Sequence, residues 1–237
     1  MYKYKRILLK LSGEALQGEK QHGIDEVRLI EYAEQIKQLL DNGVEVGIVI
    51  GGGNIFRGIS GQEAGFERVQ GDYMGMLATV INGLAIQGAI EKLGGKAQVF
   101  TSIEMSPVGV RYSKRAVLKA FENDEAAVFV FGTGNPFFTT DSTAALKAVE
   151  IDAEVILKGT RVDGVYTADP EKDPSAKKYS TLTFDEAYEK GLKIMDLTAF
   201  TMCKENNLPI IVFDMNTKGN LARLMENGDI GTIIQNK

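Results

Sequence analysis

The stretch Val44-Glu-Val-Gly-Ile-Val-Ile-Gly-Gly-Gly-Asn54 joins a short apolar run directly to a cluster of glycines. Residues 44–50 predict a strand, and their nearly unbroken apolar character indicates burial on both faces of a sheet. Glycines have no Cβ, so the backbone N–H groups of 51–53 can approach a ligand closely. The stretch therefore predicts a core strand that carries a ligand-binding loop at its carboxyl end.

The same combination of strand and glycine loop occurs three more times, at Lys10–Gly13, Gly132–Pro136 and Lys158–Arg161. Around these loops, apolar runs alternate with patterns of helical spacing along the whole chain. This alternation predicts an α/β protein, a three-layer αβα sandwich with a mainly parallel central sheet, formed by 1–237 as a single domain. The predicted strands are 7–11, 44–50, 98–101, 126–131, 155–157, 210–213 and 232–234.

Local signals place several helix ends. Gly43 ends a helix whose apolar positions run from 27 to 40, and Gly94 with Gly95 ends a long helix that includes 74–88. Ser113 is a candidate N-cap, and Thr183 with Glu186 has the spacing of a capping box. Helices are also expected at 141–149 and after 220, and 159–180 is expected to be a loop or hairpin.

Composition excludes several classes of chemistry. The 237 residues include 27 Lys and Arg against 32 Asp and Glu, a net charge of −5, which argues against nucleic acid as a partner. One cysteine, Cys203, and one histidine, His22, exclude an internal disulfide, a Cys/His zinc site and a Ser-His-Asp triad. The N-terminal apolar run ends at Lys10, and no stretch approaches the length of a membrane span, so we expect a cytoplasmic protein that binds no membrane.

Four glycine loops at the carboxyl ends of parallel strands lie at one edge of a sheet, where ligands bind. Phosphate is the ligand that such loops favour, although each loop by itself is also explained as a tight turn. A Walker A loop is excluded, because the only Gly-Lys pair, Gly95-Lys96, is followed by alanine. A dinucleotide fold is disfavoured, because Phe137 stands where the fingerprint after Gly132 needs its third glycine.

Six segments, taken in chain order, resemble the bacterial UMP kinases of the amino-acid kinase superfamily, and the resemblance spans essentially the whole chain. It is weakest at 102–125. The segments are Lys10-Leu-Ser-Gly-Glu-Ala-Leu-Gln17, Gly51-Gly-Gly-Asn-Ile-Phe-Arg57, Gly71-Asp-Tyr-Met-Gly-Met-Leu-Ala78, Gly132-Thr-Gly-Asn-Pro-Phe-Phe-Thr-Thr-Asp-Ser142, Val162-Asp-Gly-Val-Tyr-Thr-Ala-Asp-Pro170 and Met195-Asp-Leu-Thr-Ala-Phe200.

The resemblance implies an amino-acid kinase (carbamate kinase-like) fold and phosphoryl transfer from ATP to UMP in pyrimidine nucleotide biosynthesis. Residues 1–150 are then expected to bind mainly UMP, and 151–237 mainly ATP. Two alternatives stay open. One is another phosphotransferase of the superfamily, acting on an acidic amino acid, carbamate or an isoprenoid phosphate; the other is a non-catalytic uridylate sensor.

The resemblance assigns catalytic roles to Lys10, Asp141 and Asp196. Lys10 is expected to stabilise the transferring phosphoryl group, with Asp141 orienting Lys10 or a metal. The competing interpretations are a strand-end lysine that reaches solvent and an aspartate that only caps a helix. Lys158 either adds charge near the phosphates or is a surface lysine. The ATP-binding residues implied are Lys10, Leu11, Ser12, Gly13, Gly53, Arg57, Thr160, Tyr166 and Asp169, and Arg57 could instead be a surface ion-pair partner.

For UMP, the resemblance implies a contact from Asp72, for which an N-cap of the long helix is the competing interpretation. Phe137 and Phe138 are expected to line the base pocket, with at least one of them in the core. The full implied set is Gly52, Asp72, Thr133, Gly134, Asn135, Pro136, Phe137, Phe138, Thr139 and Thr140.

Regulation and assembly are carried over in the same way. The resemblance implies a hexamer, a GTP activator and a UTP inhibitor, and magnesium that is bound mainly through the phosphates of ATP. The segment it links to activation by GTP consists of Gly18, Glu19, Lys20, Gln21, His22 and Gly23. A long helix with an apolar face is a candidate for the interface between subunits.

Overall fold

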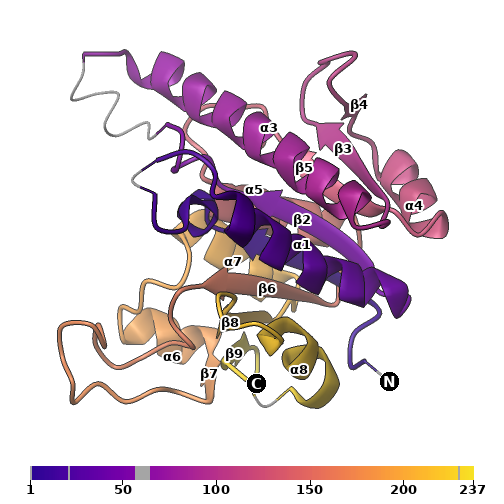
Figure 1. The fold of residues 1–237 in the computed structure, drawn as a ribbon. Helices are drawn as coiled ribbons and strands as arrows, with labels where there is room; N and C mark the ends of the chain where they lie inside the picture. The colour runs from indigo at the N-terminus through magenta and orange to yellow at the C-terminus, as the bar shows by residue number, and fades with distance from the viewer. Residues whose placement is uncertain (1, 21, 57–64, 229) are drawn as a thin grey trace.

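A computed structural model describes residues 2–20, 22–56, 65–228 and 230–237 of the chain. Within these residues, nine strands form one sheet in the order β4-β3-β5-β2-β1-β6-β8-β9-β7 (Figure 1). Neighbouring strands are parallel except β8 and β9, which confirms the predicted mainly parallel sheet. The strands are β1 (Arg6–Leu11), β2 (Glu45–Ile50), β3 (Ala97–Thr101), β4 (Val110–Arg111), β5 (Ala126–Val130), β6 (Val155–Thr160), β7 (Thr181–Thr183), β8 (Ile210–Asp214) and β9 (Thr232–Gln235).

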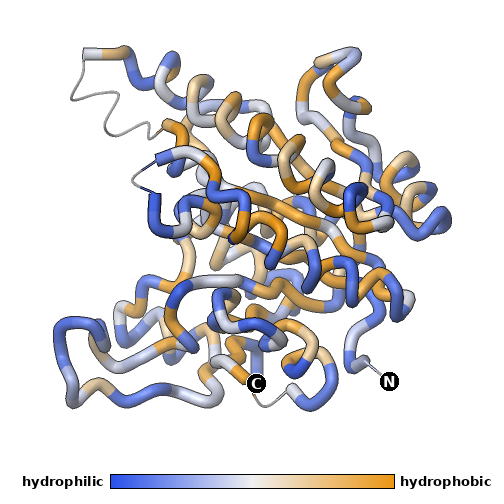
Figure 2. The backbone as a smooth tube through the Cα atoms, in the orientation of Figure 1, coloured by the Kyte–Doolittle hydropathy of each residue, from blue (hydrophilic) through white to orange (hydrophobic). Residues whose placement is uncertain are grey.

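Both faces of this sheet are buried. Along β1, Ile7, Leu9 and Leu11 belong to one apolar cluster, whereas Leu8, which points to the opposite face, belongs to a second. Side chains alternate between the faces of a strand, so an unbroken apolar run is what burial on both sides requires. Figure 2 shows the central strands as largely apolar and the outer loops as largely polar.

Helices form the two outer layers of the sandwich. The first apolar cluster contains residues of α1 (Glu26–Asp41), α3 (Arg68–Lys92) and α8 (Asn220–Asn227). The second contains residues of α4 (Lys114–Glu122), α5 (Thr140–Glu150), α6 (Phe184–Glu189) and α7 (Leu197–Glu205). These two clusters establish the predicted three-layer arrangement.

Helix caps follow the local sequence. Ser113 accepts a hydrogen bond from the backbone N–H of Ala116 at the start of α4, at 3.2 Å. Thr183 and Glu186 form the predicted capping box at the start of α6. Both signals are short-range, so the sequence alone was sufficient to locate them.

Three short elements were not predicted: the edge strands β4 and β7 and a 3-10 helix, η1 (Gly13–Gln17). In addition, α3 begins at Arg68, with Glu67 at its N-cap position, so Asp72 lies in the second turn. The interpretation of Asp72 as an N-cap is therefore wrong. Arg68 and Asp72 form an ion pair one turn apart, at 2.9 Å, and such pairs support the first turns of a helix.

The long helix α3 is unusually apolar. Contrary to the sequence reading, its length of 25 residues and its hydropathy meet the criteria for a membrane span, although half of the most apolar window is buried inside the protein. A core helix satisfies the same criteria, so this helix is weak evidence for a membrane. Its exposed apolar residues, Tyr73, Leu77, Ile81 and Leu84, are spaced by three or four positions and share one face.

The four glycine loops come together as predicted. The strands that precede or contain them, β5, β2, β1 and β6, are consecutive neighbours in the sheet, and all four run in the same direction. Their carboxyl ends consequently lie side by side, and this edge is where the candidate site is found.

Candidate active site

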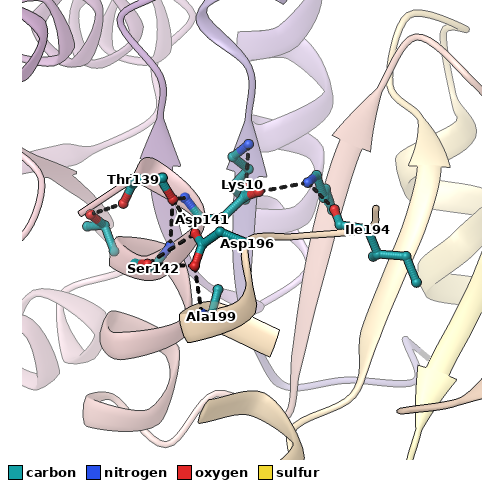
Figure 3. A network of polar contacts seen from close by, with 9 residues as sticks. Lys10, Thr139, Asp141, Ser142, Ile194, Asp196 and Ala199 are labelled. Atoms are coloured by element: carbon teal, nitrogen blue, oxygen red, sulfur yellow. Dashed lines mark hydrogen bonds and ion pairs between the residues drawn. The ribbon is translucent and has the colours of Figure 1, made fainter. Parts of the chain in front are cut away.

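Two lysines and one aspartate form an ion-paired cluster at this edge. Lys10 of β1 and Lys158 of β6 are register partners on adjacent strands, and Asp141 lies in the first turn of α5. Lys10 Nζ is 2.7 Å from Asp141 Oδ1 (Figure 3). Lys158 Nζ is 3.0 Å from Asp141 Oδ2. Lys158 also donates a hydrogen bond to the backbone carbonyl of Ile194. Asp141 therefore holds the ammonium groups of both lysines in place, and both side chains are mostly buried. Neither residue is simply a surface lysine at the end of a strand.

The charges of this cluster depend on one another. Burial by itself raises the pKa of Asp141, but the positive charges of Lys10 and Lys158 outweigh burial and bring that pKa below its usual value. Burial lowers the pKa of Lys158, the nearby charge of Lys10 lowers it further, and Asp141 opposes both effects. Asp141 is consequently a carboxylate at neutral pH, and it permits two ammonium groups to lie close together.

Asp141 is not the cap of its helix. Thr139 occupies the N-cap position of α5, and its hydroxyl oxygen accepts hydrogen bonds from the backbone N–H groups of Asp141 and Ser142 at 3.1 and 3.2 Å. The capping interpretation of Asp141 is therefore wrong. Because Thr139 satisfies the helix end, the Asp141 side chain is available to pair with the two lysines.

Asp196 lies behind this cluster. Its carboxylate caps α7 by accepting from the backbone N–H of Ala199 at 3.0 Å, and it accepts from the hydroxyls of Thr139 and Ser142 on the neighbouring helix α5 (Figure 3). These contacts fasten the start of α7 to the start of α5. A catalytic role for Asp196 stays a prediction.

A cavity of about 490 Å³ opens beside Lys10 and Lys158. Its walls contain five cationic side chains and one carboxylate, that of Glu14. Positive charge is therefore concentrated in this part of an acidic protein, and the cavity suits a polyanion. Among its lining residues, Lys10, Ser12 and Thr160 were predicted to bind ATP, and Gly18 and Lys20 belong to the segment linked to GTP. Arg28 and Asn216 were missed, whereas Glu14, Ala15 and Gln17 of the segment 10–17, and Gly159 and Arg161 of the glycine loop 158–161, had no individual role predicted.

A smaller cavity of about 160 Å³ lies next to the loop after β2. Five of its lining residues were predicted to bind UMP: Gly52, Asp72, Phe138, Thr139 and Thr140. Thr79 was missed, whereas Phe56, Gly71, Gly75 and Met76 of the quoted segments, and Gly132 of the glycine loop 132–136, had no individual role predicted. The four-residue spacing of Gly71 and Gly75 in a helix was an available signal, because glycines on one helix face permit close approach of another backbone. No comparable local signal marks Arg28 or Asn216 of the larger cavity, since they arrive from distant elements.

Asp72 connects α3 to the loop after β5. Its Oδ2 atom accepts a hydrogen bond from the backbone N–H of Phe137 at 2.8 Å and also pairs with Arg68. Phe137 has a positive φ of 70°, and its ring lies under the Arg68 guanidinium at 5.4 Å. Phe137 is 66% exposed and Phe138 is 49% exposed. The expectation that at least one of these rings is in the core is therefore wrong, because both residues are exposed, and Phe138 lines the smaller cavity.

Some predicted residues do not line either cavity. Tyr166 and Asp169 lie on the long segment after β6, where the Tyr166 hydroxyl donates to Asp163 at 2.5 Å and Asp169 pairs with Lys172. Thr133 and Asn135 bond each other in an exposed turn. Leu11 is a buried core residue, whereas Arg57 and Gln21 lie outside the described residues. Gly13, Glu19, His22, Gly23, Gly53, Gly134 and Pro136 are likewise absent from the cavity walls.

The donor atoms at this edge do not form a metal cage. Within the described part of the chain, no group of three His, Cys, Asp or Glu side chains is placed to hold a metal ion. The carboxylate of Asp141 is already paired with two lysines. A divalent cation at this site would therefore need oxygen ligands supplied by a substrate and by water.

Comparison with known proteins agrees with this geometry. Residues 5–214 match the amino acid kinase family. The chain is 61% identical over 236 residues to the uridylate kinase of Bacteroides thetaiotaomicron, with full coverage of both chains, and 57% identical to that of Porphyromonas gingivalis, with 100% and 99% coverage. Its fold matches the crystal structure of UMP kinase from Bacillus anthracis with a TM-score of 0.95 at 36% identity, covering 99% of this chain and 97% of the other.

Proposed function

The chain belongs to the amino acid kinase family and, within it, to the uridylate kinases, and from this premise we propose that its two cavities hold the two substrates. The reaction is the transfer of the γ-phosphoryl group of ATP to UMP, which yields ADP and UDP. The observation that carries the assignment of cavities is the position of the Lys10–Asp141 ion pair: Lys10 lines the larger cavity, and Asp141 directly follows Thr140, which lines the smaller one.

We assign ATP to the larger cavity and UMP to the smaller one. The larger cavity has the volume and the five cations that a triphosphate requires, and the smaller one is lined by hydroxyls, glycine backbone and the Phe138 ring. The α5 N-terminus, which Thr139 and Thr140 present to the smaller cavity, favours a phosphate. In this arrangement residues 1–150 supply the UMP cavity, whereas ATP meets residues from both ends of the chain.

The mechanism needs no general base. The second phosphate pKa of a nucleoside monophosphate lies near 6, so its attacking oxygen is already mostly ionised at neutral pH. Two polyanions must nevertheless meet, so catalysis consists of alignment and of stabilising the transferring phosphoryl group. Lys10 supplies the charge, Asp141 fixes its direction, and Lys158 adds a second charge. Backbone N–H groups of Gly52 and Gly53 approach the phosphates of the two nucleotides.

Magnesium is proposed to arrive with ATP. The residues at the site offer it no cage of their own, and this ion favours phosphate oxygens and water as ligands. Bound magnesium would neutralise part of the negative charge of the phosphates. The protein's own contribution is the lysine cluster, whose geometry is set without a metal ligand.

The assignment is tested by ADP release in the presence of ATP and a panel of acceptors: UMP, CMP, dTMP, aspartate and N-acetylglutamate. We expect the highest kcat/KM with UMP. Faster turnover of an amino acid would favour the alternative phosphotransferase, and binding of UMP without ADP release would favour the sensor.

Replacing Asp72 with asparagine is expected to raise the KM for UMP about tenfold and to change kcat by less than about twofold. A hydrogen bond between a ligand and a charged group contributes about 1.5–3 kcal/mol, and tenfold corresponds to about 1.4 kcal/mol. Steady-state kinetics at saturating ATP measure both constants.

Arg68→Ala is the matched control for this variant, because it removes the ion partner of Asp72 but leaves the carboxylate in the cavity. We expect Arg68→Ala to shift the KM for UMP less than Asp72→Asn does. Equal shifts in the two variants would mean that the Arg68–Asp72 pair only supports the helix.

We propose that the chain is a homo-oligomer, a hexamer as the resemblance implies, and that the exposed apolar face of α3 forms an interface. Leu77 and Ile81, 47% and 51% exposed, lie at its centre. Replacing Ile81 with aspartate is expected to reduce the mass of the assembly measured by light scattering, because a buried unpaired charge is costly. Val27→Asp, at a 70% exposed apolar position on α1, is the control and is expected to leave the mass unchanged.

We further propose activation by GTP and inhibition by UTP, and a cytoplasmic location. Gly18 and Lys20 of the segment linked to GTP line the ATP cavity, so a change in this segment can alter ATP binding directly. Cys203 is buried and unpaired, which suits a reducing compartment.

A further inference from the structure

Two asparagines lie buried against each other beneath the glycine loop that follows β2. Asn82, in the middle of α3, has no exposed surface, and Asn54, at the end of the loop, is 3% exposed. Both side chains are buried from water, where an amide is costly unless its polar atoms are satisfied. The hydrogen bonds of the pair explain why both amides can be buried here.

The two amides bond each other in both directions and then bond the backbone. Asn82 Nδ2 donates to Asn54 Oδ1 at 2.7 Å and to the carbonyl of Gly51 at 2.7 Å. Asn54 Nδ2 donates to Asn82 Oδ1 at 3.1 Å and to the carbonyl of Gly23 at 2.8 Å. The Gly23 N–H in turn donates to the Asn54 carbonyl at 2.8 Å. The pair thus joins three segments that are far apart in the sequence.

The loop held by this pair has no spare room. A Cβ at Gly13 would lie 2.5 Å from the Gly51 carbonyl oxygen and 2.6 Å from Asn54 Oδ1. A Cβ at Gly52 would lie 2.7 Å from the Gly75 carbonyl oxygen. The glycine loop is therefore packed tightly between the residues after β1 on one side and α3 on the other. A small displacement of the Asn54 or Asn82 side chain would consequently move the backbone N–H groups of the loop.

We propose that Asn54 and Asn82 are positioning residues for phosphoryl transfer, and that Asn54 also ties the glycine loop to the end of segment 18–23. The proposal rests on the proposed function, because it assumes that Gly52 and Gly53 approach the two nucleotides. Asn82 fixes the loop to α3 through the Gly51 carbonyl, and Asn54 makes the loop and Gly23 move together. Neither asparagine lines a cavity, so each acts through the backbone it holds.

Isosteric variants separate the two connections. Asn82→Asp keeps the shape but places an oxygen against the Gly51 carbonyl and Asn54 Oδ1, so both of its donated bonds are lost. Asn54→Asp keeps the oxygen that accepts from Asn82 but loses both bonds that the Asn54 amide donates, to the Gly23 carbonyl and to Asn82 Oδ1. We expect kcat to fall about a hundredfold in Asn82→Asp, with the KM values for UMP and ATP changing less than about fivefold, because misalignment acts on the transition state. In Asn54→Asp we expect a fall of about tenfold.

Gln35→Glu is the matched control. Gln35 is also a buried amide, 5% exposed, that donates to a backbone carbonyl, that of Met215 at 3.2 Å. Its replacement makes the same chemical change away from the glycine loop, so we expect a lower melting temperature with kcat close to that of the wild type. Kinetics are measured at a temperature where each variant is folded by circular dichroism. If Asn82→Asp does not fold, Asn54→Asp carries the test.

Hydrogen exchange of backbone amides gives a readout that is independent of turnover. We expect Asn54→Asp to speed exchange in peptides covering 18–24, and Asn82→Asp to speed it in peptides covering 50–56, relative to Gln35→Glu. Wild-type kcat and unchanged exchange in both asparagine variants would overturn the positioning role and leave the proposed function intact. An inactive wild-type enzyme in the acceptor panel would instead overturn the proposed function.

Discussion

Lys10→Ala is expected to lower kcat about a thousandfold, with the KM for UMP changing less than about threefold. Removing one charged or hydrogen-bonding group that acts on developing transition-state charge costs about 10²–10³ in rate. Lys10 is 8% exposed and points at Asp141 from the end of β1, so its ammonium group is preorganised before the phosphates arrive. Stabilisation that is realised mainly in the transition state lowers kcat without an equal change in KM.

The fold should survive this substitution, because Asp141 retains its second partner, Lys158, at 3.0 Å. Lys147→Ala is a matched control. Lys147 is 5% exposed and pairs with Glu150 at 2.7 Å, but it lies on α5 outside both cavities. We expect Lys147→Ala to lower the melting temperature and to leave kcat within about twofold of the wild type. An unchanged kcat with a raised KM in Lys10→Ala would make Lys10 a binding residue.

The sequence was sufficient for the parts of the fold that depend on short-range patterns. The strands β1, β2, β5 and β6 are apolar runs, and helices connect β1 to β2 and β5 to β6, so both their existence and their parallel direction follow from local signals. The edge strand β4 was missed because Val110–Arg111 is two residues long and exposed. Its pairing with β3 spans two residues on each strand, and no residue within β4 requires a strand.

The part of the site that could be predicted consists of the glycines and charged residues that directly follow strands in the sequence. Lys10 and Asp141 are 131 residues apart, yet their meeting follows once parallel strand ends are placed at one edge. The Asn54–Asn82 pair was not predictable, because a single asparagine in an apolar helix has no partner that its own sequence indicates. Phe137 was misplaced for a similar reason: its positive φ and its contact with Arg68 depend on how α3 packs against the loop after β5.

Asp141→Asn is expected to have a large effect on both stability and activity. The carboxylate is 16% exposed and lies between two ammonium groups, so its removal leaves like charges facing each other in a mostly buried site. Breaking a buried ion pair from one side costs about 3 kcal/mol of unfolding free energy. Lys10 also loses its orienting partner, and we expect kcat to fall about a hundredfold, as misplacement of a catalytic group does.

The pH dependence of the stability loss shows whether it comes from the charge of Asp141 or from a general loss of packing. Burial raises the pKa of Asp141, but Lys10 and Lys158 bring it below its usual value, so the folded state binds this proton less readily than the unfolded chain does. The stabilising contribution is therefore fully present above the unfolded pKa of about 4 and is lost as the pH falls through the lower folded pKa. We expect the difference in unfolding free energy between wild type and Asp141→Asn to be largest at pH 7 and to shrink on acidification below pH 4.

Urea denaturation of both proteins from pH 7 to pH 3 measures this difference directly. Asp152→Asn is the control, because Asp152 pairs with Lys114 at the surface, is 64% exposed, and has a positive φ that asparagine also tolerates. An exposed pair contributes at most about 1 kcal/mol, so Asp152→Asn should be nearly silent in stability and in kcat. If the difference in unfolding free energy between wild type and Asp141→Asn stayed constant down to pH 3, Asp141 would stabilise the fold by its shape and not by its charge. The ion pairs with Lys10 and Lys158 would then not be the source of the stability.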